Sequence, residues 1–171
     1  MKPLAPLRIL SPTAILGYGF PDASFEEGMR RRPDLIAVDA GSTDPGPYYL
    51  GAGVSFTDRG AVYRDLDRLL PAAVIAGIPL FIGSAGGCGG EPHLAWTLDI
   101  VREIAKNRGL TFRLASIHAE VDRRLVLDRL AGALRAKREL PFGATRFHGT
   151  RGLNPTIAVD TTIHSGMTYT C

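Results

Sequence analysis

Residues that can transfer protons or hold a polar ligand follow three apolar runs of the sequence. Asp39 ends the run 35–38, Ser84 comes soon after the run 78–82, and His118 directly follows a third run. Carboxylate, hydroxyl and imidazole groups can act as general acids and bases or bind a polar substrate. The sequence therefore predicts chemistry on a small molecule, provided that the fold brings these segments together.

Two histidines are the main candidates for proton transfer, because an imidazole titrates near neutral pH. His93 lies in the first turn of an expected helix, where the helix dipole favours the neutral ring. His118 is followed two residues later by Glu120, and in an extended chain these side chains point to the same side. A purely structural role for the histidines is the alternative. The predicted catalytic residues are Asp39, His93, His118 and Glu120.

Polar and glycine residues in two loops are candidates for binding the substrate. The first loop follows Asp39, and the second is the glycine-rich stretch 83–90 before a helix, whose N–H groups can hold an anion. The alternatives are that the glycines only permit close packing and that the aspartates only stabilise their own turns. The predicted substrate-binding residues are Ser42, Thr43, Asp44, Ser84, Gly86 and Gly87.

No cofactor motif has its usual form in this sequence. Gly83, Gly86 and Gly89 are three apart, which is neither the dinucleotide fingerprint nor a phosphate-binding P-loop. A divalent metal held by the predicted catalytic carboxylates and His118 is an alternative, but the spacing matches no zinc pattern. We therefore predict no metal and leave the cofactor open, with a nucleotide-binding Rossmann domain as the alternative.

Apolar runs alternate with helical patterns along the chain. The expected strands are 7–11, 35–38, 78–82 and 112–117, and the expected helices are 21–32, 58–76, 92–108 and 121–137. Thr57 or Asp58 can begin the second helix, while Gly77 and Gly109 can end the second and third. This order predicts an α/β fold, a parallel sheet with helices on both faces that is Rossmann-like and doubly wound. In such a sheet the carboxyl ends of the strands line the ligand crevice.

The composition sets limits on the class of protein. The 171 residues, 45% of them apolar, predict an α/β domain over 1–137 and an irregular tail over 138–171, with an edge strand expected at 156–161. The net charge of +3 is smaller than the positive charge typical of nucleic-acid-binding domains. No apolar run is long enough to span a bilayer. We expect a cytoplasmic homo-oligomer with a small-molecule substrate and with neither nucleic acid nor membrane as a partner.

Several uncommon sequence motifs occur over about residues 8–135, in the same order as in one known family of proteins. They are Leu10–Thr13, Gly17–Pro21, Asp39–Gly51, Ile82–Gly87, Pro92–Leu94, Thr97–Ile104 and Ile117–Val121. With them the chain resembles the N-terminal portion of the acyclic terpene utilisation (AtuA-like) proteins, which are much longer. The resemblance implies bacterial breakdown of branched terpenoid or related carboxylic substrates, and some members of that family carry the label 3-methylaspartate ammonia-lyase.

Two hypotheses of function follow. The first is an enzyme, or the N-terminal domain of one, that acts on a carboxylate- or acyl-containing metabolite by acid–base chemistry of the lyase or hydrolase type. The second is a non-catalytic binding or assembly domain of a larger oligomer. Asp39, Ser84 and His118 must converge on one edge of the sheet for the first hypothesis to hold.

Overall fold

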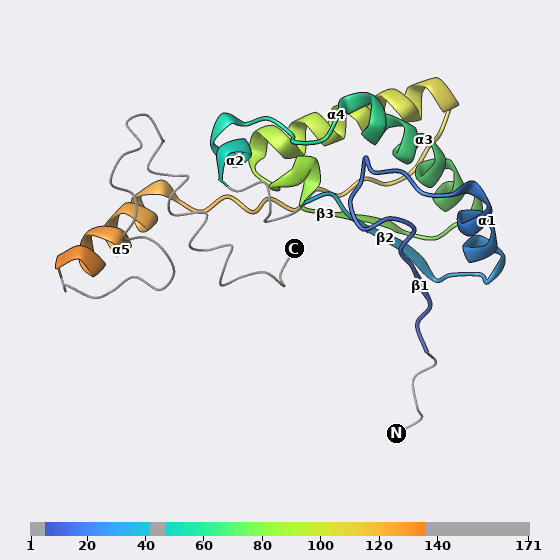
Figure 1. Cartoon of the computed structure of the whole chain (residues 1–171), viewed down its shortest axis with the longest axis horizontal. Coiled ribbons are helices and arrows are strands. Elements are labelled where there is room, and N and C mark those ends of the chain that lie inside the picture. The colour runs from blue at the N-terminus through green and yellow to red at the C-terminus, as the bar shows by residue number, and fades with distance from the viewer. Residues whose placement is uncertain (1–5, 42–46, 136–171) are drawn as a thin grey trace.

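The computed structural model describes residues 6–41 and 47–135 (Figure 1). Its strands are β1 (Ile9–Leu10), β2 (Leu35–Asp39) and β3 (Leu80–Gly83). Its helices are α1 (Asp22–Arg30), α2 (Tyr48–Ala52), α3 (Arg59–Ala76), the short 3-10 turn η1 (Ala85–Gly87), α4 (Glu91–Arg108) and α5 (Arg123–Arg135). The tail predicted over 138–171, with its edge strand at 156–161, lies outside the described residues.

The three strands form a parallel sheet in the order β1-β2-β3. Leu10 lies beside Ile36, and Ile36 lies beside Leu80. The run 35–38 alternates between buried and partly buried positions, so it forms the middle strand as its apolar character predicts. The prediction of an α/β fold with a parallel sheet is confirmed.

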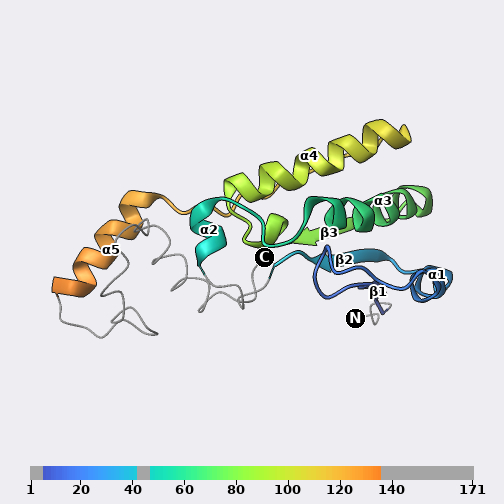
Figure 2. The same ribbon diagram turned by 45° about the horizontal axis from the view of Figure 1, so that its top comes forward.

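Helices α1, α3 and α4 all pack on one face of this sheet (Figure 2). Leu10, Ile36 and Leu80 are in register and so point to the same face. Helix α1 touches this face through Gly28, where a Cβ atom would lie 2.5 Å from Leu10. The fully buried apolar side chains that α3 and α4 add to the core are Val62, Leu66, Leu69, Ile100 and Ile104. The predicted arrangement with helices on both faces is therefore not seen among the described residues.

The opposite face of the sheet carries apolar side chains that stay open to solvent. Phe81 lies beside Ala37, and Ile9 lies beside Leu35. Phe81 is 56% exposed and Ile9 is 58% exposed. An apolar sheet face of this kind is usually covered by another layer of structure, and within 6–41 and 47–135 no helix lies on it.

The strand predicted at 112–117 does not form. After α4 the chain runs back along the sheet toward α5 without regular pairing to β3 (Figure 1). Leu114 is 49% exposed and Ile117 is 88% exposed. A parallel strand is stable when both of its faces are covered. Arg113 and Ser116 interrupt the apolar residues of 112–117, so this segment gains less than the continuous run 35–38 by joining the sheet.

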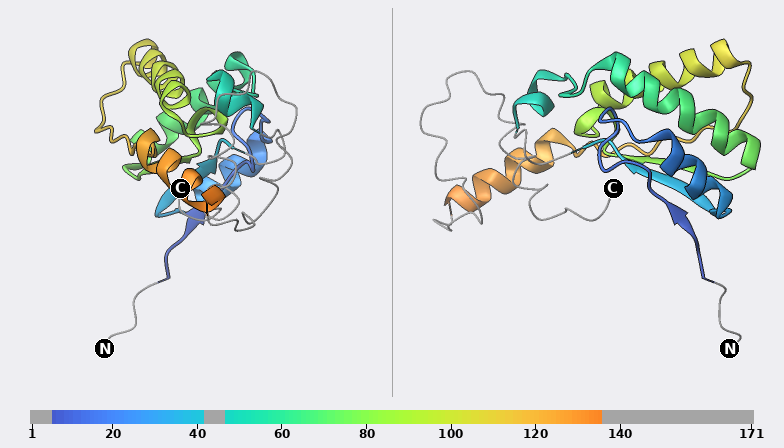
Figure 3. Two further views of the ribbon diagram at one scale, coloured as in Figure 1. Left: turned by 90° about the vertical axis from the view of Figure 1, so that its left-hand side faces the viewer. Right: turned by 45° about the vertical axis from the view of Figure 1, so that its right-hand side comes forward.

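The ends of the two long helices follow from local capping. The side chain of Asp58 accepts a hydrogen bond from the N–H of Ala61, which begins α3. Gly77 and Gly109 adopt the left-handed conformation that ends α3 and α4. Helix α2 was not predicted, whereas α5 matches the last predicted helix and lies apart from the others (Figure 3). Among the described helices, none combines the length and the apolar character needed to cross a bilayer.

Candidate functional site

The loops after β2 and β3 meet at the carboxyl edge of the sheet. The N–H of Ala40 donates to the carbonyl of Gly83 over 2.9 Å. Gly41 packs so closely on the second loop that a Cβ atom there would lie 2.4 Å from the Cβ of Ser84. The structure therefore brings the loop that begins at Asp39 against Ser84.

Asp39 is exposed at this edge, although it directly follows the apolar run 35–38. Its Oδ1 atom accepts a hydrogen bond from the N–H of Gly41 over 2.9 Å, the geometry of an Asx turn. Asp39 alternates with the buried Val38 along β2, so its side chain lies on the uncovered face of the sheet with Leu35 and Ala37. The predicted substrate contacts Ser42, Thr43 and Asp44 lie outside the described residues.

The glycine-rich loop is shaped by close packing. A Cβ atom at Gly86 would lie 2.6 Å from the carbonyl oxygen of His93, and one at Gly87 would lie 2.8 Å from the ring of Phe56. The N–H of Gly87 donates to the carbonyl of Ser84 over 2.8 Å, so this group is not available to an anion. Ser84 itself has φ 46°, a costly conformation for a residue with a side chain. Packing thus accounts for the two glycines, as the alternative interpretation states.

His93 is a buried link between α4 and the α2 region, with 1% of its surface exposed. Its Nε2 atom lies 3.1 Å from the carbonyl oxygens of both Tyr49 and Val54. Because a carbonyl only accepts, Nε2 must carry the proton and donate it. The Nδ1 atom is buried and has no hydrogen-bond partner. This geometry favours a positioning role for His93, since neither ring nitrogen faces solvent.

The first turn of α4 holds a carboxylate of the chain itself. The N–H of Glu91 donates to Oε1 of Glu120 over 2.8 Å. A Cβ atom at Gly90 would lie 3.4 Å from Nδ1 of His93 and 3.5 Å from Oε1 of Glu120, so both groups border the same point. The partial positive charge of a helix N-terminus favours an anion at this place.

His118 completes a line of three polar side chains at the same helix end. Its Nδ1 atom lies 2.5 Å from Oε1 of Glu91, and its Nε2 atom lies 3.3 Å from Oγ of Ser116. The side chains of His118 and Glu91 are 57% and 51% exposed, so a ligand can reach them from solvent. A serine, an imidazole and a carboxylate joined in this order can transfer a proton.

Contacts thus connect the three segments in which the sequence predicts site residues. The Asp39 loop touches Ser84, the glycine loop touches His93, and the α4 N-terminus touches His118 and Glu120. Within the described ranges Asp39 and His118 share no hydrogen bond, so Asp39 is not joined to the group formed by Glu91, Ser116 and His118. Among those same residues no group of three or more His, Cys, Asp or Glu side chains could hold a metal ion.

Two residues of this site received no predicted role. Glu91 stands in the polar group after the third strand, immediately before Pro92 and His93. Ser116 precedes His118 by two residues, and the argument that orients Glu120 with His118 applies equally to it. The spacing could therefore have identified Ser116, whereas the contact of Glu91 with His118 depends on the return of the chain after α4.

Comparison of the chain with protein-family models, with curated proteins and with solved structures finds no match. The resemblance to the acyclic terpene utilisation family therefore rests on the motifs quoted above.

Proposed function

We propose that the chain is an enzyme, or the N-terminal domain of one, that acts on a carboxylate- or acyl-containing metabolite by acid–base chemistry. The observation that carries this proposal is the contact of 2.5 Å between Nδ1 of His118 and Oε1 of Glu91. It stands at the N-terminus of α4, at the edge of the sheet where α/β proteins bind their ligands.

The role of His118 follows from its two contacts. A carboxylate at Nδ1 fixes the ring tautomer that carries a proton there, which leaves Nε2 as the basic nitrogen. Nε2 then removes a proton from the substrate or from the hydroxyl of Ser116, and Glu91 stabilises the resulting imidazolium. Returning that proton to the leaving group completes an elimination of the lyase type. In hydrolysis through Ser116, a water molecule that gives a proton to Nε2 then releases the acyl group from the serine.

The class of substrate is supported by the contact at Glu120. The N–H of Glu91 holds the Glu120 carboxylate at 2.8 Å, and a carboxylate or acyl oxygen of a ligand takes the same bond by displacing the Glu120 side chain. The family resemblance adds the expectation of a branched carboxylic substrate and of a bacterial, cytoplasmic catabolic setting. No cofactor enters this proposal.

A thermal-shift screen of the full chain with small dicarboxylates and acyl-CoA esters tests the proposal. A ligand that binds the folded state at a hundred times its Kd adds about 2.7 kcal/mol to the free energy of unfolding. We expect a stabilising ligand, and we expect its effect to change in Glu91→Gln but to persist in Glu103→Gln, a carboxylate farther along α4. Equal effects of the ligand on both variants would contradict the proposal.

A second candidate function, a non-catalytic assembly domain, is favoured by one specific observation. The exposed apolar face around Ile9 and Phe81 lacks a covering layer within the described ranges. A second copy of the chain, or a further segment, on this face would complete the doubly wound architecture and form a homo-oligomer. Light scattering tests this candidate, since a monomer at high concentration would exclude self-association.

A further inference from the structure

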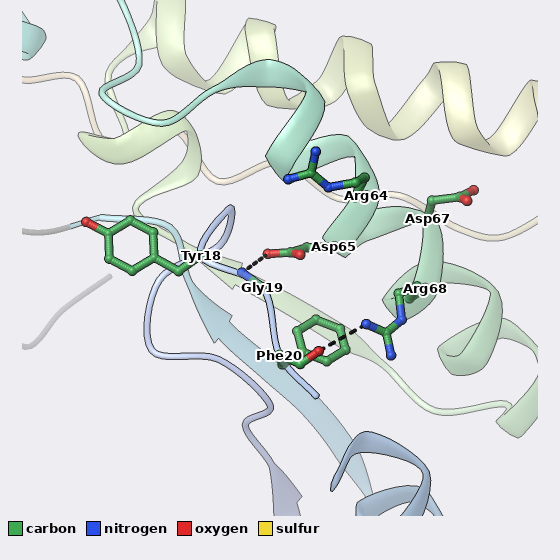
Figure 4. A pocket seen from close by; sticks show the side chains of 7 residues that line it. All are labelled: Tyr18, Gly19, Phe20, Arg64, Asp65, Asp67 and Arg68. Atoms are coloured by element: carbon green, nitrogen blue, oxygen red, sulfur yellow. Dashed lines mark hydrogen bonds between the residues drawn. The ribbon is translucent and has the colours of Figure 1, made fainter. Parts of the chain in front are cut away.

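A hollow of about 370 Å³ lies between the loop that precedes α1 and the exposed side of α3 (Figure 4). Its size falls at the lower end of the range for small-molecule sites, about 300–1,000 Å³. The residues that line it are Tyr18, Gly19, Phe20, Arg64, Asp65, Asp67 and Arg68. The proposed function uses none of them.

The loop side of this hollow is fixed by buried and stacked groups. Asp65 is 4% exposed, and its Oδ2 atom accepts hydrogen bonds from the N–H groups of Gly17 and Gly19 over 2.7 and 3.1 Å. The guanidinium of Arg68 lies 4.4 Å from the centre of the Phe20 ring and donates to the Phe20 carbonyl over 3.1 Å. The hollow is therefore formed in advance of any ligand, which lowers the entropic cost of binding.

Three of the four charged side chains around the hollow already have partners. Asp65 is satisfied by the two N–H groups of the loop, Arg68 pairs with Asp22, and Asp67 pairs with Arg108. None of these carboxylates forms an ion pair with the fourth charged side chain.

Arg64 supplies that fourth charge. It is exposed, and within residues 6–41 and 47–135 it has neither a hydrogen bond nor an ion pair. Arg64 and Arg68 are one turn apart on α3, so they lie on the same face of the helix. In Figure 4 the guanidinium of Arg64 extends toward the side of the hollow where Tyr18 lies. Tyr18 is 68% exposed and offers an aromatic ring to the same space.

We propose that this hollow binds a small organic monoanion, a carboxylate with an apolar body. The carboxylate pairs with the planar fork of Arg64, and the apolar body packs against Tyr18 and the edge of Phe20. The guanidinium of Arg64, which forms no ion pair within the described residues, matches a ligand with a single negative charge. This favours a carboxylate over a phosphate dianion. The inference does not depend on the proposed chemistry at His118.

Titration of the full chain with sodium benzoate, followed by amide NMR, tests this inference. We expect saturable shifts at Gly17 and Gly19, and an affinity loss of about tenfold or more in Arg64→Gln, since charge-assisted hydrogen bonds are the strong ones. The affinity of Arg64→Lys for benzoate should lie between those of the unaltered chain and Arg64→Gln, because lysine keeps the charge but lacks the planar guanidinium. The control Arg102→Gln removes an exposed arginine of α4 and should bind as the unaltered chain does.

Two further measurements distinguish binding at this hollow from binding at the His118 site and from the binding of any small anion. His118→Gln should bind benzoate normally, so failure of the proposed function leaves this result intact. Inorganic phosphate should bind more weakly than benzoate. Equal benzoate affinity in Arg64→Gln and the unaltered chain, absence of saturable shifts, or tighter binding of phosphate would each overturn the inference.

Discussion

Glu91 and His118 are in contact at the N-terminus of α4, with Oε1 of the first residue 2.5 Å from Nδ1 of the second. The backbone N–H of Glu91 also binds Glu120, so one residue holds two members of the segment that returns from α4. Side-chain contacts to the helix end, and not strand pairing, therefore hold this segment at the edge of the sheet. They place a basic nitrogen beside an anion-binding N–H group.

Glu120→Gln should lower the free energy of unfolding by about 0.3–1 kcal/mol, because it removes a negative charge from the N-terminus of α4. Urea unfolding at low ionic strength measures the change, and added salt should reduce it. Glu26→Gln, an exposed carboxylate within α1, is the control and should cost less. A salt-independent loss of the same size in both variants would contradict the contact.

Gly86→Ala should destabilise the chain by about 2–5 kcal/mol, because it adds strain at φ +69° to a clash with the backbone of His93. Gly77→Ala is the matched control, since it also has a positive φ but no atom within 4 Å of the added Cβ. The control should cost only about 1–2 kcal/mol. Equal midpoints of urea unfolding for the two variants would show that the glycine loop does not pack on α4 as described.

Phe81→Ser should change the free energy of unfolding of the isolated chain by no more than about 0.5 kcal/mol, because its side chain is largely exposed. Ile36→Ala, on the buried face of the same sheet, should cost about 2–5 kcal/mol. If the exposed face is an interface between copies, Phe81→Ser should also reduce the mass seen by light scattering at high concentration. A large loss of stability in a monomeric Phe81→Ser variant would mean that another part of the chain covers this face.

Asp67 on α3 accepts two hydrogen bonds from Arg108 of α4, at 2.8 and 2.5 Å. These bonds hold the pKa of Asp67 below its ordinary value. Because its pKa is lower in the folded state than in the unfolded chain, the pair stabilises the fold above the ordinary aspartate value of about 3.9. That contribution is lost as the pH falls through the folded-state pKa.

Arg108→Gln should therefore raise the pKa of Asp67 toward its ordinary value and weaken the dependence of stability on acid pH. NMR titration of the Asp67 carboxyl measures the first effect, and unfolding between pH 2 and 6 measures the second. If the Asp67 carboxyl has the same pKa in the unaltered chain and in Arg108→Gln, the ion pair does not form in solution.

The sheet and the long helices could be predicted because their signals are local. The run 35–38 is continuous and apolar, and Asp58, Gly77 and Gly109 mark helix ends by capping. The segment 112–117 carries a weaker signal, because Arg113 and Ser116 interrupt its apolar residues. Whether it pairs depends on covering layers, which a local pattern does not encode.

The candidate site could be predicted in part, because Asp39 and Ser84 follow neighbouring parallel strands and the topology therefore brings them to one edge of the sheet. His118 reaches the site through its contact with Glu91 and not through a strand. The partners of each group could not be predicted. His93 donates to the carbonyls of Tyr49 and Val54, which are far from it in the sequence. The sequence predicts a catalytic histidine here, whereas these contacts favour a buried, positioning one.

The catalytic role of His118 is tested by measuring turnover of the carboxylate or acyl-CoA ester that the screen selects, with the full chain as the enzyme. We expect His118→Gln to lower kcat/KM by about 10²–10⁴-fold, the usual contribution of a general base, and Glu103→Gln to leave it unchanged. Undiminished turnover by folded His118→Gln would show that the contact between His118 and Glu91 is structural and that the chemistry, if any, lies elsewhere.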